Sequence, residues 1–180
     1  MTVINNYIVP GVSSHMLTET AVGGKIRMFK ASRTQMQYVT PHSHRFNLTS
    51  IVLRGWVRNT IFHHKHDMQK ADHKHCETFL ETEMVYNKLG QYKSAGSSEQ
   101  EYIAETNTYE KGQMYSMAYH MIHSIEFSKD AEVLIIESPD KANGNRILEP
   151  IVNGKVIEIM EVKDWMFEHE QETKKTPKKG

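Results

Sequence analysis

The residues most able to do chemistry in this sequence are its histidines. There are 11 of them, and most fall into three groups along the chain. A neutral imidazole offers one nitrogen lone pair, so clustered histidines are candidates for holding a transition metal. The groups are His42 and His44; His63, His64, His66, His73 and His75; and His120 and His123.

The first group is a His-x-His pair directly after Pro41. In a β-strand, residues i and i+2 point to the same face, so His42 and His44 would converge on one side of a sheet. A proline before them suits the start of a strand. The alternative is a surface strand on which both imidazoles face water, and the pair alone does not decide between the two.

The spacing around this pair resembles the first motif of the cupin superfamily. In that motif, His-x-His is followed after three or four residues by a glutamate and, six residues later, by a glycine. Here three residues separate His44 from Leu48, and six more separate Leu48 from Gly55. The spacing is kept, but Leu48 stands where the family has its carboxylate, and Met36 stands where it has a preceding glycine.

A second segment resembles the second cupin motif, which is glycine, five residues, Pro-x-Gly, two residues and histidine. Gly112 and His123 match its two ends, while Ala118 and His120 replace the inner proline and glycine. Both motifs keep their long-range spacing and occur in the right order. The resemblance covers about residues 25–137.

The resemblance implies an all-β fold, the cupin-type double-stranded β-helix or jelly-roll barrel, with a mononuclear metal near its mouth. His42, His44 and His123 would be the matched metal ligands. Without the glutamate the site would have three histidines, the kind of iron site that cupin thiol dioxygenases and some diketone-cleaving cupins use. His120 is the rival third ligand, and the family spacing selects His123.

The dense middle group, residues 62–76, is interleaved with lysines and aspartates. Its spacing fits no known structural zinc pattern, and one cysteine gives little support for one. We interpret it as a long polar hairpin tip between the two motifs that binds metal adventitiously, with capture of a ligand as the alternative.

Further side chains near the motifs are candidates for binding or catalysis. Arg45 and Arg58 lie close to the first motif and could bind a carboxylate or phosphate, and Tyr119 could orient a ligand. Tyr115 and His120 are the candidate catalytic residues. For each arginine, an equally good interpretation is a solvent-exposed position on the outside of the barrel. Tyrosines at such places more often pack their rings against other side chains and leave the hydroxyl in water.

Short alternating runs rich in β-branched and aromatic residues must position these groups. Residues 46–62 are interrupted only at Arg54-Gly55, which predicts a tight turn between two antiparallel strands. Asn153-Gly154 between two apolar runs predicts a hairpin. The first fifteen residues look irregular, and residues 88–98 look like a turn. Further strands are predicted at 25–31, 36–39, 77–87, 101–109, 114–117, 124–127 and 132–137.

The chain of 180 residues fits a single cupin-like domain, residues 1–170, with a core of about 25–162. Asp164 would cap a short helix in a C-terminal extension. Residues 171–180 form a flexible basic tail.

Composition narrows the possible partners. Lys plus Arg equals Asp plus Glu at 22 each, so no global charge attracts nucleic acid or an anionic membrane. Cys76 is the only cysteine, and we find neither a signal peptide nor a membrane span, which favours a cytoplasmic protein. We expect a small-molecule ligand and, because exposed strand edges need a cover, a homodimer.

The leading hypothesis is an iron(II)-dependent dioxygenase-type enzyme that acts on a small polar or anionic molecule. Manganese, zinc and nickel are the alternative metals, because imidazole suits several of them. The second hypothesis is a non-catalytic cupin that sequesters an anionic small molecule such as a nucleotide-like signal. A hydrolytic or isomerising cupin is the third.

Overall fold

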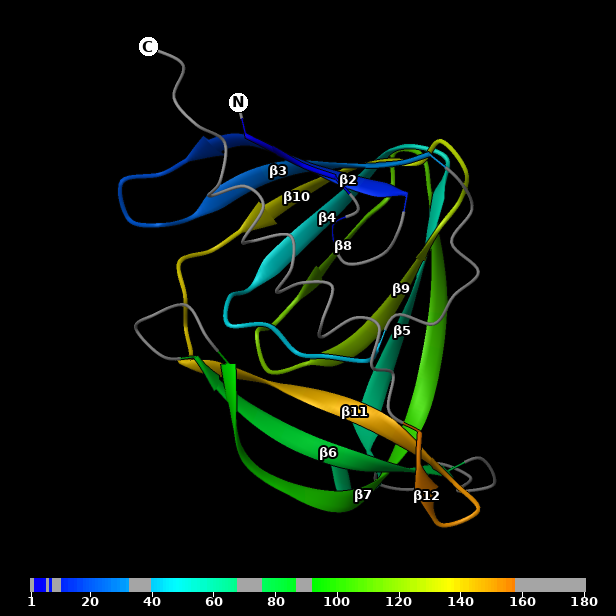
Figure 1. Ribbon diagram of the computed structural model, residues 1–180. Coiled ribbons are helices and arrows are strands. Elements are labelled where there is room, and N and C mark those ends of the chain that lie inside the picture. The colour runs from blue at the N-terminus through cyan, green and yellow to red at the C-terminus, as the bar shows by residue number, and fades with distance from the viewer. Residues whose placement is uncertain are drawn as a thin grey trace.

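The computed structural model describes residues 2–5, 7, 11–32, 40–67, 76–86 and 92–157, which form two antiparallel β-sheets (Figure 1). Six strands form sheet 1, in the order β1 (Val3–Ile4), β2 (Val12–Glu19), β3 (Lys25–Ala31), β10 (Glu132–Glu137), β4 (Leu48–Arg54) and β8 (Met114–Met117). Six more form sheet 2, in the order β12 (Lys155–Val156), β11 (Gly144–Val152), β6 (Cys76–Tyr86), β7 (Tyr92–Glu110), β5 (Trp56–His64) and β9 (Ile122–Phe127).

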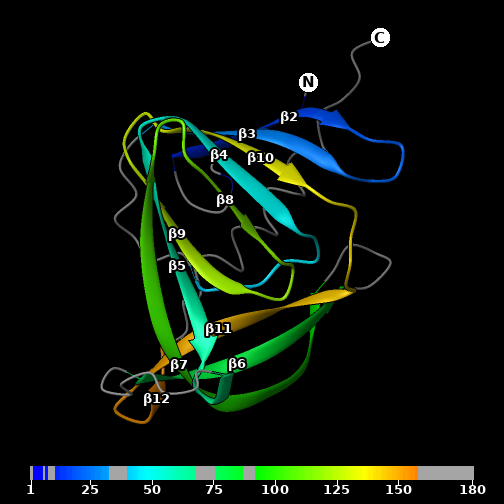
Figure 2. The same ribbon diagram turned by 180° about the vertical axis from the view of Figure 1, so that it is seen from behind.

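The chain repeatedly passes from one sheet to the other. It does so from β4 to β5, from β8 to β9 and from β10 to β11, so the two strands of each of these pairs lie in different sheets. Figure 2 shows this from behind, with β5, β7 and β9 running between the upper sheet and the lower strands. This arrangement confirms the predicted all-β jelly roll.

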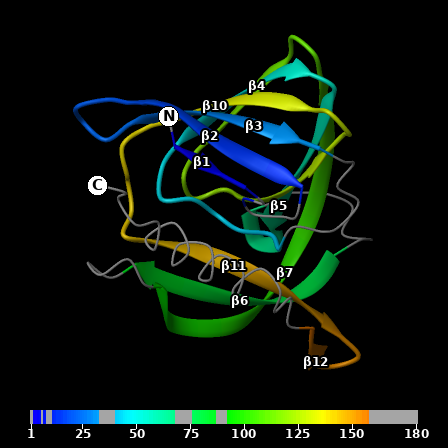
Figure 3. The ribbon, with the colours of Figure 1, turned by 45° about the horizontal axis from the view of Figure 1, so that its top comes forward.

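Two apolar clusters hold these sheets. The upper cluster lies between them: Val52, Val133 and Val57 are fully buried there and come from both sheets. The described members of the lower cluster all come from sheet 2, because that sheet curves over itself at β6, β7 and β11 (Figure 3). Its members are Phe62, Phe79, Tyr102, Ile122 and Leu148.

Several predicted elements are confirmed. The strands at 25–31, 114–117 and 132–137 have the predicted bounds, and β6 and β9 differ from theirs by one or two residues. Asn153 and Gly154 form the predicted hairpin between β11 and β12, with φ of 52° and 71°. Two positive φ angles suit the right-handed twist of the flanking strands. The long hairpin between the motifs is β6–β7.

The predicted turn at Arg54-Gly55 is not a hairpin. β4 pairs with β10 and β8, whereas β5 pairs with β7 and β9, so Gly55 is a corner at which the chain changes sheets. β4 and β5 are adjacent in sequence, and buried and more exposed residues alternate in both. A hairpin and a corner at which the chain changes sheets produce the same pattern in the sequence.

Two segments predicted to be irregular are strands. β2 begins at Val12, within the expected lead-in, because it pairs with β3 and buries Val12 and Ser14. β7 begins at Tyr92, within the expected turn, because it pairs with β6. Residues 93–99 are exposed, so no hydrophobic alternation indicated a strand.

The histidine-rich segment is not a hairpin tip, since β7 lies between β5 and β6 in the sheet. His63 and His64 belong to β5, and a 3-10 turn, Lys65–Asp67, follows them. His73 and His75, the strand predicted at 36–39, the helix after Asp164 and the tail lie outside the described residues. No helix of the described part is long and apolar enough to cross a membrane.

Candidate metal centre

Three histidines from two distant segments meet between the apolar clusters. His42 and His44 precede β4, and His123 lies on β9. The amide of His42 donates to the carbonyl of His123 at 2.9 Å, and the amide of His123 donates back to His42 at 3.0 Å. This reciprocal pair of backbone hydrogen bonds brings the two motifs together. One ligand atom from each ring lies within 4.8 Å of the others.

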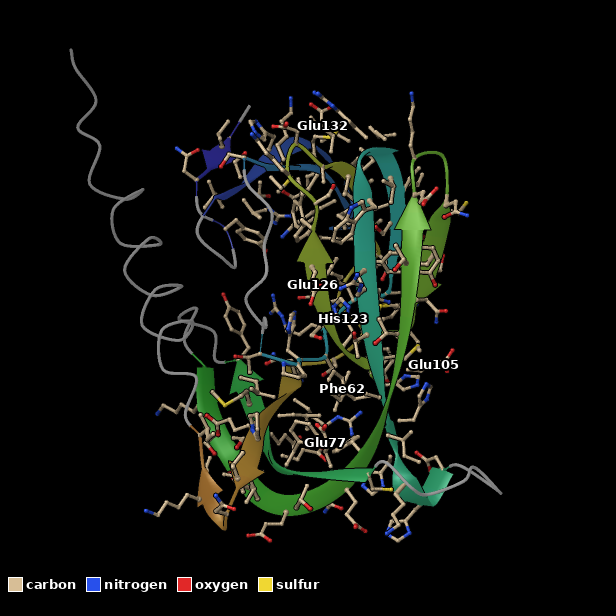
Figure 4. The ribbon with its side chains drawn as sticks, turned by 90° about the vertical axis from the view of Figure 1, so that its right-hand side faces the viewer. Phe62, Glu77, Glu105, His123, Glu126 and Glu132 are labelled. Atoms are coloured by element: carbon tan, nitrogen blue, oxygen red, sulfur yellow. The ribbon has the colours of Figure 1, made fainter. Side chains whose placement is uncertain are left out.

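His123 is placed by the alternation of β9. Its side chain shares a strand face with Ile125 and Phe127, which belong to the upper cluster, while Ile122 points to the lower one. His123 is therefore only 3% exposed. Figure 4 shows it at mid-height, above Phe62 and Glu77 and below Glu132.

Hydrogen bonds to Nδ1 orient two of the three rings. Nδ1 of His42 lies 2.9 Å from the carbonyl of Thr40, and Nδ1 of His123 lies 2.7 Å from Oδ1 of Asn59. Carbonyl and amide oxygens only accept, so each Nδ1 carries the proton and each Nε2 presents its lone pair. Nε2 of His123 lies 2.9 Å from Nε2 of His44.

The surroundings keep the imidazoles neutral. Burial lowers the pKa of His42 and lowers the pKa values of His44 and His123 well below the ordinary 6.5. Charge on a neighbouring histidine adds to the lowering at His44 and His123. Neutral imidazoles at pH 7 are in the form that binds a metal.

Apolar side chains border the cluster. The ring of Phe46 lies 5.1 Å from that of His44. Leu48, which stands where the motif that this segment resembles has a carboxylate, is 6% exposed and packs in the upper cluster opposite Met117. Among the described residues, the metal-ligating group contains these three histidines and no carboxylate.

The donor set suits a divalent transition metal. Imidazole nitrogens bind iron, zinc, copper and nickel, whereas carboxylates and water suit magnesium and calcium. Three neutral ligands on one side leave the charge of a divalent ion uncompensated. They also leave coordination positions open to a further ligand.

The candidate catalytic residues do not join this cluster. Tyr115 is buried in the upper cluster beside Ser50, with its ring 4.6 Å from that of Tyr109. Burial raises the pKa of Tyr115 to about 12. His120 is exposed in the turn before β9, and the structure describes no contact between its ring and the three imidazoles.

The candidate ligand-binding residues have other partners. Arg45 pairs with Asp140 at 3.3 Å and lies over the ring of Tyr86. Arg58 pairs with Glu126 at 2.8 Å on an exposed strand face. Tyr119 approaches the site through its backbone, since its carbonyl accepts a hydrogen bond from the amide of His44 at 3.0 Å.

Two residues of the site were missed from the sequence. Asn59 is a polar residue at an inward position of β5, between Val57 and Ile61, and that inward alternation was the available signal. Arg146 on β11 exchanges hydrogen bonds with Ser43, and its guanidinium donates to the carbonyl of His120 at 2.6 Å. Nothing local in the sequence marks Arg146.

Two cavities lie elsewhere on the molecule. One of about 410 Å³ lies beside Val12, Lys30 and Arg54, and one of about 450 Å³ lies beside Thr49, Ser116 and Ser138. Neither is lined by the three histidines.

Comparison with known proteins gives structural likenesses only. Searches of protein-family models and of curated proteins find no match. KdgF from Halomonas sp. has a TM-score of 0.41 and 14% identity over 72% of this chain and 79% of its own. An RmlC-like cupin family protein with a double-stranded β-helix fold, from Methanocaldococcus jannaschii, has a TM-score of 0.40 and 12% identity over 71% and 80%.

Hydroxypropylphosphonic acid epoxidase from S. wedmorenis has a TM-score of 0.46 and 10% identity over 76% of this chain. The match covers 55% of the epoxidase, so this chain spans little more than half of it. With TM-scores below 0.5 and identities of 10–14%, any proposal of function depends on the residues of this chain.

Proposed function

We propose that this chain binds one divalent metal through Nε2 of His42, His44 and His123. Iron(II) is the favoured metal, and manganese, zinc and nickel are the alternatives. We further propose that it is a dioxygenase-type enzyme acting on a small polar or anionic molecule. The observation that carries the proposal is the convergence of three neutral imidazoles. In His42 and His123, a hydrogen bond at Nδ1 fixes the ring so that Nε2 points away from that hydrogen bond.

When bound, iron(II) would supply the one-electron chemistry that a reaction with dioxygen needs. The protein's own groups hold the imidazoles in place and exclude water from one side of them. Phe46 and the upper cluster form that apolar side. The donor set carries no negative charge, so an anionic substrate would meet no repulsion from the ligands.

The second candidate is a cupin that binds an anionic molecule without turning it over, or that acts hydrolytically. The binder is favoured by the places of the two candidate catalytic residues. Tyr115 is buried in the upper cluster, and the structure describes no contact between the ring of His120 and the three imidazoles. We also propose a homodimer, which sedimentation velocity would test.

The test of the proposal is the metal content of protein purified without an affinity tag, measured by inductively coupled plasma mass spectrometry. We expect about one iron per chain in the wild type and a loss of it in His42→Ala and His123→Ala. His15→Ala is the matched control, because His15 lies on β2 and bonds to Ser13 instead of joining the cluster. It should keep the metal.

Oxygen uptake then separates the two candidates. Iron-loaded protein that consumes oxygen with one member of a panel of small carboxylates and phosphates supports the enzyme. A fully loaded protein that binds a panel member and consumes no oxygen supports the binder. Wild-type protein that takes up no iron, manganese or zinc on anaerobic loading would overturn the metal centre.

A further inference from the structure

Asn59 is the buried polar partner of the most buried histidine in the cluster. It lies on β5 and is 2% exposed, next to β9, where Ile61 is paired with His123 and Asn59 with Ile125. Asn59 and His123 are therefore diagonal neighbours on the inward face of two paired strands. Their side chains meet at 2.7 Å, between Oδ1 of Asn59 and Nδ1 of His123.

The amide of Asn59 is also held from its other side. Its Nδ2 donates to the sulfur of Met117 at 3.6 Å, and Met117 lies on β8 in the opposite sheet and is 4% exposed. Reversing the amide would turn its NH2 toward the imidazole and its oxygen toward the sulfur of Met117. A thioether sulfur has no hydrogen to donate to that oxygen. The two contacts together fix Oδ1 toward His123.

We infer that Asn59 is a positioning residue that sets both the tautomer and the ring orientation of His123. The acceptor at Nδ1 keeps the proton there, so the lone pair is at Nε2, which faces His44. The metal-binding part of this inference rests on the proposed function, but the tautomer does not. Partners of this kind typically change metal affinity about 10–100-fold when removed.

The first test uses metal-free protein with ¹⁵N-labelled histidine and long-range ¹H–¹⁵N correlation spectra. We expect His123 to show a protonated Nδ1 in the wild type. Asn59→Leu, which has similar size and no acceptor, should shift His123 toward protonated Nε2 or a mixture. Asn59→Asp, which keeps an acceptor oxygen, should restore the wild-type pattern.

Asn107→Leu is the matched control. Asn107 is paired with Asn59 across β5 and β7, but it is exposed. It should leave His123 unchanged. If Asn59→Leu does not fold, Asn59→Ser takes its place, because a serine hydroxyl on the same backbone is too short to reach Nδ1. A folded variant without the acceptor that keeps the wild-type tautomer would overturn the inference.

The second test titrates zinc into the same proteins and measures affinity. We expect the variants without the acceptor to bind about 10–100-fold more weakly, and Asn59→Asp and Asn107→Leu to remain within a few-fold of the wild type. Unchanged affinity in Asn59→Leu despite a shifted tautomer would overturn the positioning role. If His123→Ala also retained full affinity, the proposed metal centre itself would fail, whatever the spectra show.

Discussion

Leu48 illustrates how a single residue changes the character of this site. It stands where the cupin motif has a carboxylate ligand, and it packs instead in the upper cluster at 6% exposure. Among the described residues the cluster therefore has only neutral donors, and Leu48 contributes to stability through packing. Packing at this position is separate from the proposed binding of a metal by the three histidines.

This separation gives a prediction at the residue scale. Leu48→Ala should lower the free energy of unfolding by about 2–5 kcal/mol, because it leaves a cavity in a close-packed cluster, while the metal content stays the same. Urea unfolding of the metal-free protein measures the first quantity. Leu53→Ala, on the same strand but 39% exposed, is the control and should change stability far less. Loss of metal in Leu48→Ala would contradict a pure packing role.

At the scale of secondary-structure elements, the turn at Gly55 determines that β4 and β5 lie in different sheets. Gly55 has φ of +70° and joins β4 in sheet 1 to β5 in sheet 2. A Cβ at this position would collide with the hydroxyl of Ser128, which accepts a hydrogen bond from the amide of Trp56 at 2.9 Å. The corner is thus closed by a contact with the chain between β9 and β10.

We therefore expect Gly55→Ala to destabilise the protein more than Gly112→Ala. Gly112 has φ of +89° and nothing within 4 Å of an added Cβ, so its substitution costs only the left-handed backbone, about 1–2 kcal/mol. Gly55→Ala adds the collision with Ser128. Chemical unfolding of both variants measures the difference, and equal losses would show that the corner accommodates a methyl group.

A buried ion pair joins two other strands of sheet 1. Glu137 on β10 is 7% exposed, and its carboxylate lies 2.9 Å from Nε of Arg27 on β3. Burial raises the pKa of Glu137 above 4.5, and the charges of Arg27 and Lys25 oppose that shift without cancelling it. The folded state therefore holds this proton more tightly than the unfolded chain.

The sign of the pH dependence follows. Stability from Glu137 is full below about pH 4.5 and falls as pH rises through its raised pKa in the folded protein. Glu137→Gln cannot titrate. The unfolding free energy of the wild type minus that of Glu137→Gln should therefore decrease between about pH 4.5 and neutrality, measured by urea unfolding across that range. A difference that increases with pH would mean that the pair with Arg27 dominates.

At the scale of the whole molecule, the histidine cluster joins two segments that are far apart in the sequence. His44 and His123 are 79 positions apart, and the segment of His42 and His44 is attached to β9 by two backbone hydrogen bonds. An unfolded chain does not hold these imidazoles together. A metal bound by all three therefore binds the folded state selectively.

Metal should accordingly raise the thermal midpoint of the wild type in a concentration-dependent way. Free metal at a thousand times its Kd contributes about 4 kcal/mol, by mass action. His123→Ala should lose this effect, and His15→Ala should keep it. Differential scanning calorimetry with added zinc measures both. An equal rise in His123→Ala would assign the binding to surface histidines such as His63, His64 and His66.

The sequence by itself determined most of the strands, the hairpin at Asn153-Gly154 and the three histidines, because alternation, turn residues and motif spacing are local patterns. Tertiary structure alone decided which strands pair, that Gly55 changes sheets, and that β2 and the start of β7 are strands. It also decided that Asn59 contacts His123 and that Arg45 and Arg58 are occupied by carboxylates. These outcomes depend on partners tens of residues away, which a local pattern does not identify.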